Sequence, residues 1–143
     1  MEFKKTHIGA YGIIIRDNKI ALIKKARGGY KGKLDLPGGG IEHTETPIET
    51  LKRELAEEIN GTVISAKLLD TTAVNIKWEF EPDSFEDLHH IGVLYYVEIK
   101  EENLKEDSDG LDSNGADWYL IFDLEEEMLS PLAWYSLKLL GFK

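Results

Sequence analysis

The sequence contains no cysteine among its 143 residues, which excludes a disulfide framework, a cysteine-based zinc site and a cysteine nucleophile. It has no apolar run approaching the roughly 18 residues of a membrane-spanning helix, and its first residues lack the apolar stretch of a signal peptide. Positive charge is scarce, because 17 basic residues stand against 27 acidic ones, for a formal net charge of −10. This balance argues against binding to nucleic acid or to an anionic membrane. We therefore expect a soluble, cytoplasmic protein.

What the sequence does contain fits one globular domain. With 143 residues and 42% hydrophobic side chains, a single domain over residues 1–143 has enough apolar material for a core. Charge is unevenly distributed: nine basic and three acidic residues give residues 1–41 a net +6, whereas one basic and eleven acidic residues give residues 101–127 a net −10. The acidic stretch is either a solvated loop or a partial source of cation ligands, and composition does not choose between these alternatives.

The spacing of apolar residues predicts strands mixed with two or three helices, and so an α/β or α+β domain around a mixed sheet. Strands are expected at His7–Ile15, Lys19–Lys25, Val63–Ala73, Ile76–Phe80, Ile91–Ile99 and Trp118–Phe122. Loops are expected at Ala26–Lys33, Glu81–His89 and Glu101–Asp117, and helical segments at Leu124–Glu127 and Pro131–Leu140.

One more helix has clear signals at both ends. Thr46 can cap its N-terminus, Pro47 suits the first helical position, and Glu49 completes a capping box with Thr46. Apolar residues then follow at spacings of three and four, which places them on one stripe: Ile48, Leu51, Leu55 and Ile59. Asn60-Gly61 ends the helix, since either residue can adopt the left-handed conformation of a C-terminal cap.

Three carboxylates, Glu54, Glu57 and Glu58, lie together on this helix and away from its apolar stripe. Because like charges repel at this spacing, they need a positive partner. Carboxylate and carbonyl oxygens favour Mg²⁺, Mn²⁺ or Ca²⁺ over zinc. The alternative is an ordinary acidic face in contact with solvent. The preceding Leu36-Pro37-Gly38-Gly39-Gly40 favours a cation site, because glycine backbone can approach a ligand closely and offer it a carbonyl.

These features stand in an order that resembles a known motif. Gly39, Glu45 and the run Arg53-Glu54-Leu55-Ala56-Glu57-Glu58 occur in the register of the signature box of the Nudix hydrolases. The box here spans residues 39–61. Six specified positions match in register, so the resemblance is far more specific than a lone glycine motif.

Two places depart from the family pattern. Asn60 and Gly61 replace the usual glycine and aliphatic residue, and Leu34 stands where many relatives have tryptophan. Because Asn tolerates positive φ better than other non-glycine residues, we expect the turn to be kept. Neither departure removes a carboxylate.

The resemblance implies a three-layer α/β/α sandwich with a mixed sheet, and a Mg²⁺-dependent enzyme with Mn²⁺ as the alternative ion. It implies hydrolysis of a diphosphate bond in a nucleoside diphosphate linked to another moiety. The implied metal ligands are Glu54, Glu57, Glu58 and the carbonyl of Gly38. The implied catalytic set is Glu54, Glu58, Arg53 and Glu45, in which Arg53 orients the glutamates and pairs with Glu45.

Other candidates lie outside the box. Arg27, Lys31 and Lys33 are expected either to bind phosphates of the substrate or only to keep their loop soluble. Asp112 or Asp117 is the candidate for a further acid, with a plain surface acid as the alternative. The candidates for contact with a ring of the substrate are Tyr30, Trp78, Phe80, His89 and His90, with core packing as the alternative for Trp78 and Phe80.

A non-catalytic Nudix-like module that binds a nucleotide or serves regulation is the alternative function. Such a module is expected to lose glutamates of the box, and this chain keeps all of them, so an enzyme is favoured. The expected partner is a nucleotide-like diphosphate, and not nucleic acid or a membrane. The resemblance also leaves open a homodimer.

Overall fold

The structure is a computed structural model, and it describes residues 1–101, 103–105 and 113–143. Its strands are β1 (Glu2–Ile13), β2 (Ile15–Arg16), β3 (Lys19–Lys25), β4 (Leu34–Asp35), β5 (Gly38–Gly40), β6 (Thr62–Glu81), β7 (Ser84–Lys100) and β8 (Ser113–Leu120). Its helices are α1 (Pro47–Ile59) and α2 (Pro131–Leu139), with the short 3₁₀ helices η1 (Ile121–Asp123) and η2 (Glu126–Met128).

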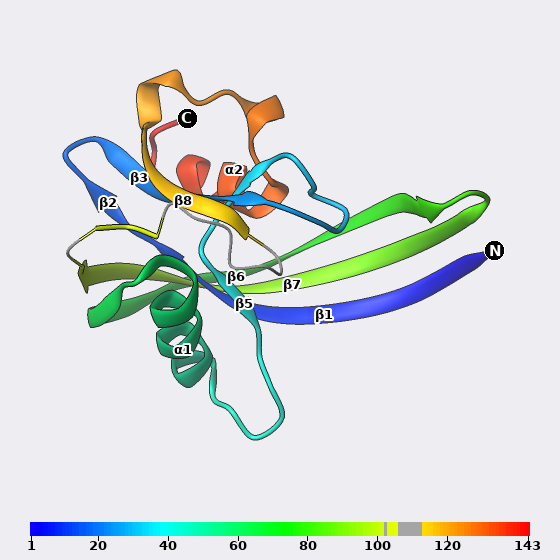
Figure 1. The fold of residues 1–143 in the computed structure, drawn as a ribbon, viewed down its shortest axis with the longest axis horizontal. Helices are drawn as coiled ribbons and strands as arrows, with labels where there is room; N and C mark the ends of the chain where they lie inside the picture. The colour runs from blue at the N-terminus through cyan, green and yellow to red at the C-terminus, as the bar shows by residue number, and fades with distance from the viewer. Residues whose placement is uncertain (102, 106–112) are drawn as a thin grey trace.

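Two sheets form the centre of the molecule (Figure 1). In the first, the strand order is β5-β1-β7-β6. Strands β1 and β7 are parallel and the other neighbours are antiparallel, so this sheet is mixed, as predicted. In the second sheet the order is β2-β3-β4, and β8 pairs with β3.

Two hydrophobic cores lie on opposite sides of these strands. Successive side chains of a strand point to opposite faces, so neighbouring residues of β1 enter different cores. Tyr11 packs in one core with Leu132 of α2, whereas Ala10 packs in the other with Leu55 of α1. The order of helix, sheet and helix that the resemblance implied is therefore confirmed.

Helix α1 begins and ends as its sequence predicts. The side chain of Thr46 accepts a hydrogen bond from the backbone N–H of Glu49, and the carboxylate of Glu49 accepts one from the N–H of Thr46. At the other end Asn60 has a φ of 60°, and its N–H donates to the carbonyl of Leu55. The left-handed turn is thus kept with Asn in place of the family's usual glycine.

The β6–β7 hairpin corrects the predictions for the middle of the chain. The two strands expected at Val63–Ala73 and Ile76–Phe80 are one strand, β6, and most of the expected loop Glu81–His89 belongs to β7. Asp83, with a φ of 60°, lies in the turn between them. Figure 1 shows this hairpin and the first half of β1 extending away from both helices. The first part of β7 carries polar residues on both faces, with Glu86 and His90 on one and Asp87 and His89 on the other, so the apolar alternation that marks a strand is weak there.

Smaller corrections concern the C-terminal third. Strand β8 begins at Ser113, inside the expected loop Glu101–Asp117, and ends at Leu120 before η1. The helical turn expected at Leu124–Glu127 is η2, slightly further along the chain. In the described part of the chain, no helix is both long enough and apolar enough to span a membrane.

Candidate active site

The glycine segment Gly38–Gly40 forms β5, which pairs with β1 at an edge of the first sheet. Gly38 has a φ of 142°, and a Cβ there would lie 2.2 Å from the carbonyl oxygen of Ala10. A Cβ on Gly39 would lie 2.7 Å from the carboxyl carbon of Glu54. A side chain is therefore excluded at Gly38, and at Gly39 it would displace the carboxylate of Glu54, because the backbone of β5 lies directly against that carboxylate of α1.

Arg53 lies at the centre of the carboxylates of the box. Its Nε and Nη2 donate to the two oxygens of Glu45 at 2.8 and 2.9 Å, and its Nη1 donates to Glu54 at 2.9 Å. Hydrogen bonds from Arg53 lower the pKa of Glu45 to about 2. A bidentate pair of this kind fixes the orientation of both groups. The predicted pairing of Arg53 with Glu45 is present, and it ties the loop before α1 to the helix.

Glu58 is the buried carboxylate of α1, with only 4% of its surface exposed. Its Oε1 accepts a hydrogen bond of 2.9 Å from the backbone N–H of Gly38. Burial raises the pKa of Glu58 well above its usual value, and the negative charge of Glu54 raises it further. A cation beside this side chain would favour its ionised form, because an opposite charge offsets the cost of burial.

The three glutamates of the box have different surroundings. The side chain of Glu54 is 20% exposed and lies between Arg53 and Gly39, whereas that of Glu57 is 63% exposed.

The same residues can be compared with the needs of a metal ion. Among the residues that the structure describes, no group of three or more His, Cys, Asp or Glu side chains is arranged so that it could hold a metal ion. Mg²⁺ is usually held by one or two carboxylates and keeps several waters. Glu54 and Glu58, beside the glycine backbone, therefore fit Mg²⁺ or Mn²⁺ by their donor chemistry.

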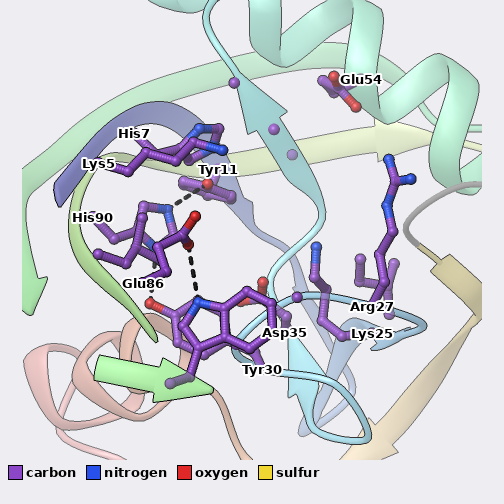
Figure 2. Close-up of a pocket in the computed structure, with 18 residues that line it drawn as sticks. Lys5, His7, Tyr11, Lys25, Arg27, Tyr30, Asp35, Glu54, Glu86 and His90 are labelled. Atoms are coloured by element: carbon purple, nitrogen blue, oxygen red, sulfur yellow. Dashed lines mark hydrogen bonds between the residues drawn. The ribbon is translucent and has the colours of Figure 1, made fainter. Parts of the chain in front are cut away.

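A cavity of about 590 Å³ opens beside these carboxylates (Figure 2). Figure 2 shows Glu54 on the helix side, with Lys25 and Arg27 along one wall. The structure thus brings Arg27 and residues of the box to one cavity. Lys31 and Lys33 lie on the same loop but outside the lining of this cavity. Lys25, which the sequence did not single out, adds a second positive charge to this wall, and Lys5 also lines the cavity.

Aromatic residues occupy the part of the cavity away from Glu54. Of the five predicted ring-contact candidates, Tyr30, Trp78 and His90 line the cavity, whereas Phe80 and His89 do not. Phe80 is 40% exposed, and its ring contacts that of Phe3 with the centroids 5.9 Å apart. The cavity therefore has a carboxylate side and an aromatic side.

His90 is held between two tyrosines. Its Nε2 lies 2.6 Å from the hydroxyl of Tyr11, and its Nδ1 lies 3.0 Å from the hydroxyl of Tyr30. Only 3% of His90 is exposed. Burial lowers the pKa of His90 to about 4, and the neighbouring charge of His7 adds to this shift. His90 is therefore neutral near pH 7 and has one N–H donor and one acceptor nitrogen.

Of the two candidates for a further acid, Asp117 does not line the cavity that Glu54 lines. Asp117 lies on β8 and lines a separate, smaller cavity of about 300 Å³, and Asp112 lies outside the described residues. The acids outside the box that do line the main cavity are Asp35 and Glu86. Asp35 is buried and accepts a hydrogen bond of 2.5 Å from the hydroxyl of Ser130. Burial raises the pKa of Asp35.

Sequence reasoning missed the contributions of β1, namely Lys5, His7 and Tyr11. Strand β1 runs parallel to β7, which places His7 opposite His90. The separations of two and four residues would put the three β1 side chains on one face of a strand. The sequence does not reveal which strand pairs with β1, so it could not place that face against the cavity.

Comparison with known proteins identifies the family. The family model described as NUDIX domain matches residues 5–140, nearly the whole chain. The chain therefore belongs to the Nudix family, as its box indicated.

Individual relatives agree with this assignment. An 8-oxo-dGTP diphosphatase from Proteus vulgaris is 39% identical over 74 residues, which are 51% of this chain and 66% of that protein. An ADP-ribose pyrophosphatase from Methanocaldococcus jannaschii is 32% identical over 127 residues, which are 86% of this chain and 71% of that protein. A MutT NUDIX hydrolase from Burkholderia pseudomallei has a crystal structure with a TM-score of 0.75 at 23% identity, covering 96% of this chain and 99% of that one. This last likeness confirms the fold.

Proposed function

We propose that the protein is a Mg²⁺-dependent pyrophosphohydrolase, with Mn²⁺ as the alternative ion. It cleaves a diphosphate bond in a nucleoside diphosphate linked to another moiety. The observation that supports this most directly is the position of Glu54 and Glu58 against the glycine backbone of β5, beside a cavity that Lys25 and Arg27 also line. Carboxylates that can hold a cation, next to basic side chains that can bind an anion, suit a diphosphate substrate.

The metal ion would be held by Glu54, Glu58 and the carbonyl of Gly38, with Glu57 as a further ligand or a neighbour of the site. When bound, a divalent ion neutralises phosphate charge and lowers the pKa of a bound water. The chain itself prepares this site. The N–H of Gly38 fixes the carboxylate of Glu58 at 2.9 Å, and Arg53 fixes that of Glu54.

The remaining roles follow from position. Glu54 faces the cavity, so we propose that it or Glu58 accepts the proton of the attacking water. Arg27 contacts the phosphates, where a guanidinium can bind two oxygens at once. Lys31 and Lys33 lie outside the lining, so they act through the positive potential of their loop and not through contact.

The relatives support a reaction of this class. One is named a diphosphatase of 8-oxo-dGTP and the other a pyrophosphatase of ADP-ribose. Both names describe hydrolysis within the phosphate chain of a nucleotide. All the carboxylates of the box are present in this chain, which favours an enzyme over a module that only binds.

A substrate panel tests the proposal. 8-oxo-dGTP, ADP-ribose, nucleoside triphosphates and nucleotide sugars are incubated with the protein in Mg²⁺, in Mn²⁺ or in EDTA, and the products are separated and measured by anion-exchange chromatography. We expect hydrolysis of at least one compound in Mg²⁺ and its loss in EDTA. Binding of a nucleotide by calorimetry without hydrolysis of any compound would contradict the proposal and support the binding module.

A further inference from the structure

The part of the cavity away from Glu54 is built on one face of the extended hairpin. Alternate residues of a strand share a face, so Glu86, Leu88 and His90 of β7 all line the cavity. The residue between the first two, Asp87, points to the opposite face, where its carboxylate accepts a hydrogen bond of 2.8 Å from the side chain of Asn75. Glu86 and Asp87 are neighbours on one strand but have different surroundings, and of the two only Glu86 lines the cavity.

Glu86 is held in place by Trp78. The indole N–H of Trp78 donates to one oxygen of Glu86 at 2.9 Å. A Cβ on Gly29 would lie 3.1 Å from the ring of Trp78, so the glycine-rich loop packs against that ring. Tyr30, the next residue of the loop, also lines the cavity. An ionised carboxylate has about four acceptor positions, so Glu86 can accept further N–H groups after the one from Trp78.

Tyr11, His90 and Tyr30 line the same cavity and form a hydrogen-bonded triad. With His90 neutral, one tyrosine donates to the ring and the other accepts from it, since each ring nitrogen faces one hydroxyl. The accepting tyrosine keeps its own O–H proton for a third group. Burial raises the pKa of both tyrosines, so both keep their protons near pH 7. If His90 were protonated, both hydroxyls would be left to donate, so at least one donor is present in either state.

Taking the proposed function as given, we propose that Glu86 and the Tyr11–His90–Tyr30 triad select a substrate with a guanine-type base. The Watson–Crick edge of guanine presents two N–H donors, at N1 and the 2-amino group, followed by the acceptor O6. Glu86 supplies acceptors for the two N–H groups, and the triad supplies an O–H for O6. The rings of Trp78 and Tyr30 provide apolar and aromatic surface for the base.

The same contacts disfavour adenine. The adenine edge presents the acceptor N1 where guanine has an N–H, so a carboxylate and a ring nitrogen with lone pairs would face each other. Hypoxanthine tests the contact to the 2-amino group separately, because it keeps N1–H and O6 but lacks that group. The order of affinity expected at this site is therefore guanine, hypoxanthine, adenine.

Calorimetric titration of GDP, IDP and ADP in Mg²⁺ tests the inference on the full chain. A bidentate contact to a base edge discriminates by about 1–3 kcal/mol, so GDP should bind at least about fivefold more tightly than ADP, with IDP between them. In Glu86→Gln the ratio of GDP to ADP affinity should fall, and only the part of it that the triad contributes should remain. The matched control is Asp87→Asn, on the other face of the strand, which should keep the wild-type ratio.

Tyr30→Phe tests the donor side of the same site. The variant keeps the aromatic ring and removes one hydroxyl of the triad. Tyr11→Phe is the companion variant, because either tyrosine can be the one that keeps its proton for the base. Loss of the donating hydroxyl should weaken the binding of GDP and IDP together relative to ADP, because both carry the 6-oxo group, and should leave the ratio of GDP to IDP affinity unchanged. A wild-type ratio of GDP to ADP affinity in both Tyr30→Phe and Tyr11→Phe would overturn the role of the triad.

Three results would overturn the inference about Glu86: no measurable binding of GDP, binding of ADP as tight as that of GDP, or a Glu86→Gln protein that keeps the wild-type ratio. Circular dichroism of each variant shows that its fold is intact. Failure of the proposed function looks different. A preference for GDP without Mg²⁺-dependent hydrolysis of any panel compound contradicts the reaction, whereas hydrolysis of ADP-ribose without that preference contradicts only the base site.

Discussion

The two ends of the cavity are assembled in different ways. At the carboxylate end (Gly38, Gly39, Arg53, Glu54 and Glu58), the bond from the N–H of Gly38 to Glu58 joins residues 20 positions apart. At the ring end (Tyr11, Tyr30, Trp78, Glu86 and His90), the contacts of His90 join residues 60 and 79 positions apart. The proposed chemistry is thus placed by one continuous stretch of chain, and the proposed selection of substrate by the pairing of distant strands. Changes at one end should therefore alter turnover, and changes at the other should alter affinity.

The largest effect is expected from the carboxylates of α1. Glu54→Gln and Glu58→Gln should each lower kcat by at least about a hundredfold, the usual contribution of a placed acid or base. In Glu58→Gln the side-chain oxygen can still accept the hydrogen bond from Gly38, so the fold should be kept. Steady-state hydrolysis of the best panel substrate in excess Mg²⁺ measures the change. Glu127→Gln, an exposed glutamate elsewhere, is the control and should turn over like wild type.

A smaller loss of turnover is expected from Arg53→Lys. A lysine cannot make the bidentate contact with Glu45 while also holding Glu54, so both carboxylates lose their fixed orientation. Residues that hydrogen-bond to metal ligands and orient them typically contribute about 10- to 100-fold to metal affinity or activity. The measurement is kcat as a function of Mg²⁺ concentration, with the neighbouring exposed Lys52→Ala as control. An unchanged Mg²⁺ dependence and an unchanged kcat would show that Arg53 does not position the site.

A pair of glycine substitutions compares the two ends directly. In Gly39→Ala the new methyl overlaps the carboxylate of Glu54, so kcat should fall about tenfold or more with little change in KM. In Gly29→Ala the new methyl meets Ile76 and Trp78, so KM should rise a few-fold with little change in kcat. Both variants have the same added group, which makes each the control for the other. A fall in kcat for Gly29→Ala together with a rise in KM for Gly39→Ala would contradict the proposed division of roles between the two ends.

The smallest effect concerns the stability of the ring end and its dependence on pH. The pKa of His90 is lowered to about 4 in the folded protein, from about 6.5 when unfolded. The unfolded chain therefore binds more protons between these values, and the free energy of unfolding should fall as the pH drops from about 6.5 toward 4. The loss attributable to His90 is at most about 3 kcal/mol.

Urea denaturation at a series of pH values measures this dependence. Comparison with His90→Gln, which cannot take up the proton, isolates the contribution of His90 from those of the carboxylates. The variant should lose less stability than wild type over the same pH interval. If the free energy of unfolding depends on pH equally in the two proteins, protonation of His90 is not the cause of the loss of stability.

The difference between the two ends also explains what the sequence could predict. The box, the cap at Thr46 and the left-handed turn at Asn60 depend on residues within about one helix of each other, and all three are present in the structure. Glu86 was placed in an expected loop, because the strand that contains it extends away from the helices and has polar side chains on both faces. Lys5 and His7 reach the cavity only through the pairing of β1 with β7, which no local pattern encodes.

The central claim is that Glu54 and Glu58 make the carboxylate end a site for a divalent ion. Titration of Mn²⁺ into the protein, followed by electron paramagnetic resonance of the free ion, tests this without reference to any substrate. We predict saturable binding to wild type that Mg²⁺ displaces, and loss of that binding in the double variant Glu54→Gln, Glu58→Gln. Binding of Mn²⁺ to the double variant with the wild-type affinity would contradict the account.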